Sequence, residues 1–363
     1  FLLGHVYYEA RMGGRLGELF EDYQKRHPKD RDAWFFIGLG HQEQENLGRA
    51  LQAYSEGLRR LSEPERRFIQ SIVMIADTED AAAGNSLPAE EDLRAYWTGR
   101  DPLFLTPENE RLMEHCRRVA YANLRYGDPA RELDGWMTDR GQAYIRYGQP
   151  VTRNLHMDRL NYISLMETWS YPDFEITFKF IGGDHWRVVN VWIRGTALSR
   201  YDDLVERVPE FYDDPYWLKR FEVPFQIAQF RGREGKTRVE LYYGLPGEHV
   251  THSTEHSGVE QVDVKQGMFL FDAGWDTLST SVHTISKMPW VSAEGTTDGY
   301  LFWGEKLDLA PGRYHLAVEM EDQASKSLGA FRDSLEVRHF GESELEVSGV
   351  LAARRGVERG EGT

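Results

Sequence analysis

The sequence predicts a multi-domain α+β protein, with helical repeats at its N-terminus, a mixed α+β domain in its centre and a β-sandwich at its C-terminus. Residues 1–80 repeat one helical pattern at a spacing of ~34 residues. Residues 88–198 change from helical periodicity to the alternation of half-buried strands, and residues 223–342 hold short strand-like segments separated by Gly, Pro and Asp. At 363 residues the chain is long enough for two or three domains.

Two units of the N-terminal repeat stand in the same phase. In the clearer unit, the repeated aromatic and small residues are Trp34, Gly38, Ala50 and Tyr54. They resemble the tetratricopeptide repeat, in which small residues let paired helices approach and aromatic residues fill the joint. We assign these four residues to packing. Because stacked repeats form a concave surface, the array either binds a segment of another protein or serves as a docking platform for the chain's own next domain.

The central domain starts after a small, polar boundary at residues 81–88. We expect one helix from Glu90 to Trp97, and a second helix that starts with Thr106 as N-cap and Pro107 in its first position. The expected strands, of which the last two form a hairpin, are Tyr144–Pro150, Glu167–Tyr171, Phe174–Phe180 and Trp186–Ile193.

The most distinctive motif of the chain is Asp134-Gly135-Trp136-Met137-Thr138-Asp139-Arg140-Gly141, which continues to Tyr147-Gly148-Gln149-Pro150. This spacing resembles the signature of the GWxTD domain. The match extends upstream through Thr106–Glu110 and Arg118–Asn123, and downstream through Glu167–Pro172. The resemblance implies an envelope-associated bacterial protein of multi-domain build, and it carries over no catalytic residue and no cofactor.

The motif admits two interpretations. Asp139 and Arg140 offer a carboxylate and a guanidinium that could bind a polar ligand. In the structural interpretation, Asp139 caps a turn, Gly135 and Gly141 supply unusual backbone angles or close approach, and Trp136 packs beneath them. We favour the structural interpretation, because no Ser-His pair, second carboxylate or phosphate loop accompanies the motif. The closing residues Tyr147, Gly148 and Pro150 are assigned to structure as well.

Residues 199–222 form an acidic and aromatic connector with one or two short helices. Its anchors for a partner protein are expected among Tyr212, Tyr216, Trp217 and Arg220. Its paired acids, Asp202-Asp203 and Asp213-Asp214, could hold calcium or serve a glycosidase, but adjacent acids in such a segment usually form a solvated face.

Residues 223–342 are expected to form about seven short strands of an immunoglobulin-like sandwich. The segments that predict it are 238–243, 261–264, 268–271, 300–303, 314–320 and 334–337, and residues 343–363 form a charged tail. Trp275, Trp290 and Trp303 could stack on sugar rings if they lie on one face. His249, His252 and His256 are the best metal candidates, although a solvated His-bearing loop is the favoured interpretation.

The bulk composition limits the classes of partner. A formal net charge of −16 argues against nucleic acid and anionic lipid. Phosphate-loop and dinucleotide motifs do not occur, so no cofactor is expected. The single cysteine, Cys116, excludes an intramolecular disulfide, and its helical context predicts a buried thiol. The chain carries no ~20-residue apolar span. It begins at Phe1, so a signal peptide, lipid anchor or membrane helix could precede it.

These observations together predict a non-enzymatic, exported scaffold or accessory subunit. It would bind parts of a larger membrane-associated assembly, such as an energy-conversion or transport complex, on the periplasmic face. Two other functions stay open. One is a carbohydrate-binding or carbohydrate-processing envelope protein that uses the sandwich aromatics, and the other is a metal-dependent hydrolase built on the three histidines.

Overall fold

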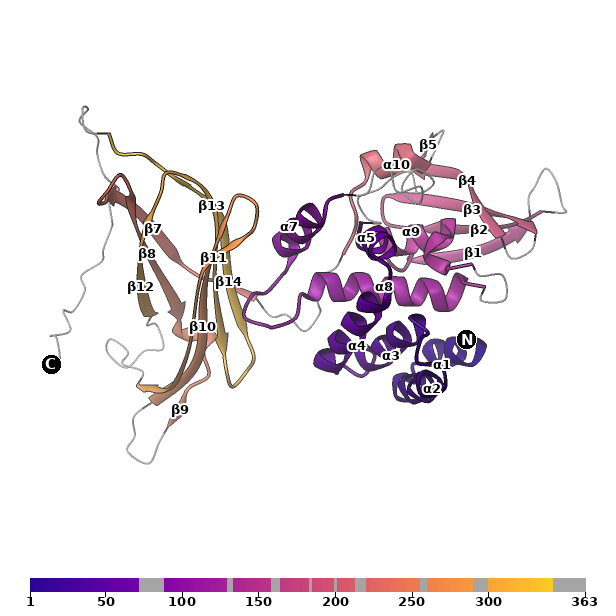
Figure 1. The fold of residues 1–363 in the computed structure, drawn as a ribbon, viewed down its shortest axis with the longest axis horizontal. Helices are drawn as coiled ribbons and strands as arrows, with labels where there is room; N and C mark the ends of the chain where they lie inside the picture. The colour runs from indigo at the N-terminus through magenta and orange to yellow at the C-terminus, as the bar shows by residue number, and fades with distance from the viewer. Residues whose placement is uncertain are drawn as a thin grey trace. The chain divides into compact units, whose positions relative to one another are not determined.

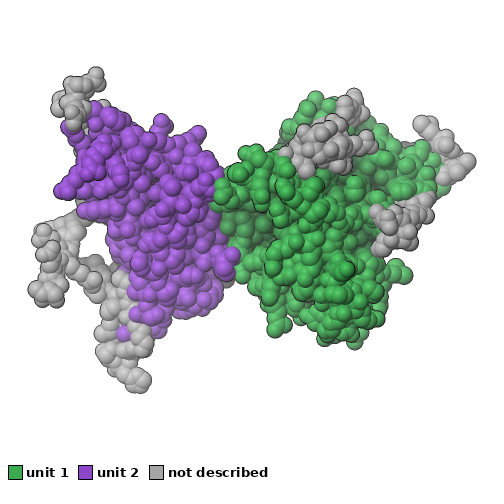
Figure 2. Space-filling model, in the orientation of Figure 1, with its two compact units in different colours: residues 1–102, 108–214 green, residues 103–107, 215–363 purple. Residues whose placement is uncertain are grey.

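The computed structural model describes residues 1–71, 88–128, 133–157, 164–182, 185–198, 201–212, 220–254, 260–289 and 300–341. The chain divides into two compact units, which Figure 2 shows in different colours. Unit 1 comprises Phe1–Pro102 and Glu108–Asp214, and unit 2 comprises Leu103–Pro107 and Pro215–Thr363. Within the described ranges, no helix is long and apolar enough to cross a bilayer.

Unit 1 begins with consecutive helices that pack as hairpins (Figure 1). They are α1 (Leu2–Glu9), α2 (Gly13–Arg26), α3 (Asp32–Gln42), α4 (Leu47–Arg60) and α5 (Glu63–Ser71). Gly38 of α3 lies against Tyr54 of α4, whose side chain is 1% exposed. Ala50 is fully buried, and Trp34 is half-buried beneath the guanidinium of Arg60. All four predicted packing residues therefore lie at the α3–α4 joint.

Helices α7 (Glu90–Arg100) and α8 (Glu110–Tyr126) follow. The predicted start of the second helix is wrong by about one turn. Its N-cap is Asn109, whose side chain accepts a hydrogen bond from the amide of Leu112 at 2.8 Å, whereas Thr106 and Pro107 belong to unit 2. Both Thr and Asn cap helices, so residue type alone does not separate the two positions.

A five-stranded antiparallel sheet completes unit 1, in the order β1-β2-β3-β4-β5. Its strands are β1 (Thr152–Met157), β2 (Leu165–Ser170), β3 (Phe174–Gly182), β4 (His185–Ile193) and β5 (Thr196–Leu198). The predicted hairpin is confirmed as β3 and β4. Before the sheet come η2 (Gly135–Met137) and α9 (Asp139–Tyr147), and after it comes α10 (Tyr201–Arg207).

The predicted strand at Tyr144–Pro150 is wrong, because these residues largely belong to helix α9. The aromatic and β-branched side chains of this segment favoured a strand. The residues at the two ends of α9 favour a helix instead. Thr138 caps its start by accepting a hydrogen bond from the amide of Gly141, and Gly148 ends it with a φ of 74°. Local capping and burial of nearly every side chain override the propensity.

One hydrophobic core runs through all of unit 1. It joins side chains of the N-terminal helices, such as Phe20 and Phe36, to side chains of α8, α9 and the sheet, such as Val119, Ile145 and Phe178. Figure 1 shows α8 between the α1–α4 helices and the β1–β5 sheet, and α1, α3 and α4 all contact it. The helical repeats therefore serve as a platform for the next part of the chain, which is one of the two roles expected for them.

Unit 2 contains two β-sheets that share a core, so it is a sandwich. One sheet has the order β11-β10-β13-β14-β6 with β9 paired to β10, and the other has the order β12-β8-β7. The strands are β6 (Arg220–Glu222), β7 (Phe225–Arg231), β8 (Thr237–Pro246), β9 (Ser253–Thr254), β10 (Glu260–Asp272), β11 (Thr277–Pro289), β12 (Tyr300–Leu309), β13 (Gly312–Asp322) and β14 (Leu328–Val337). A short 3-10 helix, η3 (Gly247–His249), follows β8.

The strand prediction for unit 2 needs two corrections. Segments 261–264 and 268–271 form one strand, β10, because Lys265–Gly267 continue its pairing with β13. Strands β6, β7, β9 and β11 were missed. β11 is rich in Ser and Thr and has no buried face, so its sequence lacks the apolar alternation by which strands are recognised.

A five-residue segment from between α7 and α8, Leu103–Pro107, packs on the large sheet of unit 2. The fully buried carboxylate of Glu319 on β13 accepts hydrogen bonds from the amides of Phe104 and Leu105, each at 2.8 Å. Arg332 donates to the same carboxylate at 2.8 Å. The charge on Glu319 is thus paired and hydrogen-bonded, as a buried carboxylate requires.

The α3–α4 joint yields a stability prediction. A Cβ on Gly38 would lie 2.4 Å from the Tyr54 ring, so Gly38→Ala is expected to lower the free energy of unfolding by about 1–3 kcal/mol. Gly17 in α2 has nothing within 4 Å of the same position, so Gly17→Ala is expected to raise it by about 0.5–1 kcal/mol. Urea unfolding followed by circular dichroism measures both. Equal effects of the two substitutions would contradict the joint described here.

Candidate functional site

The GWxTD-like motif packs directly on the backbone of α8. A Cβ on Gly135 would lie 2.0 Å from the carbonyl oxygen of Ala122, and a Cβ on Gly141 would lie 1.9 Å from the carbonyl oxygen of Gly135. Neither position has room for a side chain. Trp136 is 4% exposed and packs on Phe68, with ring centroids 4.9 Å apart. The two glycines therefore bring η2, α9 and α8 into backbone contact.

Polar groups of the motif fix this contact. Asn123 of α8 accepts a hydrogen bond from the amide of Trp136 at 3.1 Å. Thr138, rather than Asp139 as predicted, caps the helix, and its hydroxyl also donates to the carbonyl of Gly135 at 2.7 Å. Asp139 instead accepts from the amide of Val188 in β4 at 2.8 Å. Thr138 thus connects α9 to η2, and Asp139 connects α9 to the sheet.

Arg140 is engaged inside unit 1. Its guanidinium lies over the rings of Tyr126 and Trp186, at 4.8 and 4.7 Å from their centroids, and donates to Glu167 at 3.3 Å. Burial lowers the pKa of Arg140, and the Glu167 carboxylate opposes this effect. Two aromatic rings and the Glu167 carboxylate already contact the Arg140 guanidinium. This group therefore contributes to packing and is not presented to a ligand.

Two buried arginines cap helix ends next to the motif. Arg118 of α8 is 4% exposed and donates to the carbonyls of Ile145, Arg146 and Phe211 at 3.1, 3.3 and 2.9 Å. Its guanidinium fills the space beside Gly148, where a Cβ would lie 2.9 Å from it. The last carbonyls of α9 would otherwise have no partner in the helix. The Arg118 guanidinium therefore occupies the space that a side chain at Gly148, the closing glycine of the motif, would need.

Arg146 of α9 makes the same kind of contact with α10. Its guanidinium donates to the carbonyls of Val205 and Val208 at 3.0 and 3.2 Å. The amide of Phe211 donates to the carbonyl of Arg146 at 3.2 Å. The motif thus positions the chain that leaves α10, and this chain forms one wall of a cavity.

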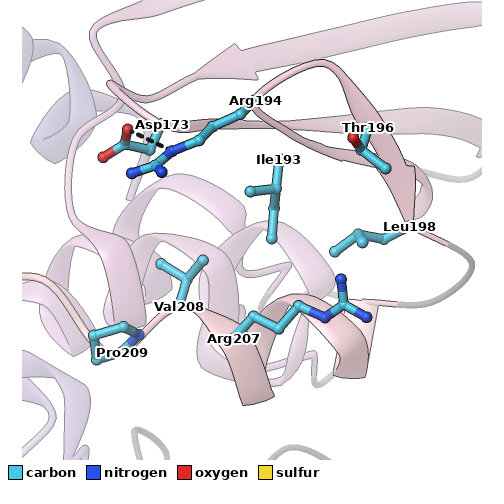
Figure 3. A pocket seen from close by; sticks show the side chains of 8 residues that line it. All are labelled: Asp173, Ile193, Arg194, Thr196, Leu198, Arg207, Val208 and Pro209. Carbon is cyan, nitrogen blue, oxygen red and sulfur yellow. Dashed lines mark hydrogen bonds and ion pairs between the residues drawn. The ribbon is translucent and has the colours of Figure 1, made fainter.

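That cavity lies between the β4–β5 hairpin and the end of α10 (Figure 3). Its volume is about 590 Å³. Apolar lining comes from Ile193, Leu198, Val208 and Pro209, and polar lining comes from Asp173, Arg194, Thr196 and Arg207. Arg194 Nε lies 3.4 Å from Asp173 Oδ1. The sequence interpretation missed this site, because its residues come from three separate segments and form no motif.

The expected partner anchors of the connector lie elsewhere. Tyr212 is held inside unit 1 between the guanidinium groups of Arg111 and Arg118, at 3.1 and 3.9 Å from its ring centroid. Tyr216 and Trp217 lie outside the described residues, as do Asp213 and Asp214. Arg220 is the first residue of β6. Leu204 of α10 is fully buried in the core of unit 1, so the connector is partly built into that unit.

The histidine triplet does not converge in the described part of the chain. His249 ends η3 and stacks on Phe221, with centroids 4.7 Å apart. His252 Nε2 lies 3.1 Å from the carbonyl oxygen of Gly247. His256 lies outside the described residues, and among those described no group of three His, Cys, Asp or Glu is placed to hold a metal ion.

The predicted tryptophans occupy different places. Trp275 stacks on His315 at the β10–β11 turn, and Trp303 packs toward the sandwich core beside Tyr243. Trp290 lies outside the described residues. Instead, Tyr300 and Phe302 of β12 stack on each other with centroids 5.6 Å apart, and they are 52% and 70% exposed. They form an aromatic patch on the outer face of the small sheet.

Strand β11 is the other exposed feature of unit 2. It has 13 residues and stands at the end of its sheet, so within the described residues it pairs with β10 alone. Leu278 and Val282 are 52% and 43% exposed. From Ser279 to Ile285 its pairing with β10 runs without a register shift. No Asp, Glu, Lys or Arg occurs between Thr277 and Ser286.

Comparisons with known proteins add little. No protein-family model matches the chain, and no curated protein matches it significantly. Among solved structures, the alpha chain of the chicken interferon gamma receptor is similar at 6% identity, over 52% of this chain and 97% of that chain, with a TM-score of 0.17. A TM-score of this size carries no argument. The GWxTD resemblance rests on the motif residues, and the immunoglobulin-like class of unit 2 stays a prediction.

The first prediction from this site concerns the glycine contact. Gly135→Ala is expected to destabilise unit 1 by about 3 kcal/mol or more, because its new Cβ would meet backbone that cannot rotate away. Met137 occupies the variable position of the same motif and is 44% exposed, so Met137→Ala is expected to cost less than about 1 kcal/mol. Urea unfolding measures both. A well-folded Gly135→Ala variant would contradict the backbone contact.

The second prediction concerns His115 of α8. Its Nε2 lies 2.6 Å from the carbonyl oxygen of Ile69 and its Nδ1 lies 3.1 Å from the Tyr212 hydroxyl, which fits a neutral ring that donates from Nε2. Burial lowers the pKa of His115 to about 4. As the pH falls below the unfolded value of about 6.5, the unfolded chain binds a proton that the folded chain does not. This residue's contribution to stability therefore decreases progressively toward pH 4.

Nitrogen-15 NMR of the imidazole tests this directly. The expected result is a neutral ring with the proton on Nε2 from pH 8 down to about pH 5. A charged His115 ring at pH 6 would contradict the buried environment. Tyr212→Phe serves as a check, because it removes the donor to Nδ1 and is expected to change the Nδ1 chemical shift without charging the ring.

Proposed function

We propose that this chain is a non-enzymatic scaffold or accessory subunit that binds other proteins, with β11 as one of its contact surfaces. The observation that carries the proposal is the edge of β11, which has no partner strand beyond β10 in the part of the chain that the structure describes. An edge strand presents unpaired amide and carbonyl groups, to which an extended segment of another protein can add as a further strand. The length and regular register of β11 suit this mode of binding.

The residues of β11 strengthen the proposal. Natural proteins usually protect an exposed edge with charged side chains, proline or a bulge. The central part of β11, Ser279–Ile285, has none of these protections, and its polar side chains are Ser, Thr and one His. A partner strand from another protein would explain why this segment has no such protection and no second neighbour among the described strands.

The proposed setting is the periplasmic face of a bacterial membrane, within a larger assembly such as an energy-conversion or transport complex. It follows from the resemblance to the GWxTD domain and from the modular build. The motif residues support a non-enzymatic role in one respect, since Arg118, Asp139 and Arg140 are all engaged in packing and helix capping. An immunoglobulin-like class for unit 2 would suit the same role, because such sandwiches commonly serve as binding modules.

Carbohydrate binding is a second candidate, and the patch of Tyr300 and Phe302 favours it. Their exposed, stacked rings could pack against the apolar face of a sugar. Trp275 and Trp303 do not share that face, so the patch consists of different residues from those predicted.

A mild-detergent pull-down from native membranes tests the scaffold function with two matched variants. Val282→Lys places a charge on the β11 edge, and Val189→Lys places the same charge at a residue of β4 in unit 1 that is 41% exposed and does not belong to β11. We expect the wild type and Val189→Lys to recover the same membrane-complex subunits in fixed ratio, and Val282→Lys to lose them. Recovery of the chain alone, or with glycan, would contradict the proposal, as would an unchanged set with Val282→Lys.

A further inference from the structure

We propose that the cavity between the β4–β5 hairpin and α10 binds the free carboxyl terminus of a polypeptide whose last residue is aliphatic. The site belongs to unit 1 and is separate from the β11 edge, so it goes beyond the strand contact proposed above. Its volume of about 590 Å³ lies within the range of ligand sites, which is ~300–1,000 Å³. Ile193, Leu198 and Val208 give it an apolar lining that suits an aliphatic side chain.

The charges of the cavity favour a carboxylate. Two guanidinium groups, Arg194 and Arg207, and one carboxylate, Asp173, line the cavity, in a chain whose net charge is −16. Figure 3 shows the side chain of Arg207 extending from α10 toward Leu198, so its charge lies next to the apolar lining. A carboxylate can accept two parallel hydrogen bonds from such a group. An inorganic anion has no apolar group that could pack against the apolar lining of the cavity.

Arg207 is the guanidinium that the ligand carboxylate would meet. Arg194 is paired with Asp173, and Figure 3 shows this pair on the other side of the cavity from the guanidinium of Arg207. The side chains of Arg194 and Asp173 are 78% and 64% exposed, so their pair lies at the solvent-facing rim of the cavity.

The walls of the cavity are held in place. Arg194 and Gly195 both have positive φ, 47° and 83°, which defines the tight turn between β4 and β5. The amide of Arg194 donates to the carbonyl of Asp173 at 3.1 Å. On the opposite side, Arg146 of the motif holds the carbonyl of Val208 at 3.2 Å. A site fixed in this way loses little entropy when a ligand binds.

Strand β5 explains why a polypeptide is favoured over a small acid. It is the last strand of its sheet in the described ranges, and two of its residues, Thr196 and Leu198, line the cavity. An extended chain can pair with this edge while its carboxylate reaches Arg207. β5 has only three residues, so the pairing would involve the last two or three residues of the ligand.

Fluorescence anisotropy with the full chain and a labelled tetrapeptide, Ala-Thr-Val-Leu, tests the proposal. We expect saturable binding of the peptide with a free carboxylate, and binding of its C-terminal amide to be weaker by ~10-fold or more, since a charge-assisted hydrogen bond contributes ~1.5–3 kcal/mol. Arg207→Gln should weaken the carboxylate peptide by a similar factor. Arg15→Gln makes the same charge change at an exposed residue of α2 and should leave binding unchanged.

Three results would overturn the inference. They are equal binding of the acid and amide peptides, equal binding by Arg207→Gln and Arg15→Gln, and competition by N-acetylleucine at the concentration at which the unlabelled peptide competes. The last result would assign the cavity to a small carboxylic acid. Val282→Lys should bind the peptide as the wild type does, so a failed β11 contact and a failed cavity site are distinguishable.

Discussion

The buried guanidinium of Arg118 is the contact on which the arrangement of unit 1 depends. It lies in α8, pairs with Glu114 at 2.7 Å and supplies hydrogen bonds to the end of α9 and to Phe211 after α10. Burial would raise the pKa of Glu114, but Arg117 and Arg118 outweigh it and lower that pKa to about 2. The ion pair therefore persists at any ordinary pH. Removing the guanidinium would take a donor from the carbonyls of Ile145 and Phe211, whereas Glu114 would keep its hydrogen bonds from Arg117. Leaving buried carbonyls without a donor is among the more destabilising changes a core can undergo.

The GWxTD-like motif is best understood as the counterpart of α8. Gly135 and Gly141 allow backbone contact, Thr138 starts α9, Asp139 reaches the sheet, and Gly148 leaves space for Arg118. Through Arg146, the same segment determines where the chain leaves α10 and hence the shape of the cavity beside β5. Packing alone can therefore account for the spacing of Gly135, Thr138, Asp139, Gly141 and Gly148, because each of these residues contacts a defined neighbour.

The sequence predicted elements with a strong local signal and missed those decided by distant contacts. The β3–β4 hairpin and the repeat residues Gly38 and Tyr54 could be predicted, since alternation and small–aromatic spacing are local patterns. The second half of α9 was predicted as part of a strand, because its caps and its burial against α8 were not apparent in its side-chain types. The cavity could not be predicted at all, since it joins Asp173, the β4–β5 hairpin and the end of α10 only after folding. Likewise, β11 carries no apolar alternation and is defined by its pairing with β10.

The helical repeats and the sheet of unit 1 should unfold as one cooperative body, because a single core and α8 join them. Native-state hydrogen exchange measures this directly, since it gives an opening free energy for each protected amide. The expected result is that the slowest amides of α3 and β3 share one opening free energy, and that Arg118→Met lowers both by the same amount. Exchange of α2–α4 at a distinctly lower free energy, with β2–β4 still protected, would contradict the central place given to α8 and Arg118.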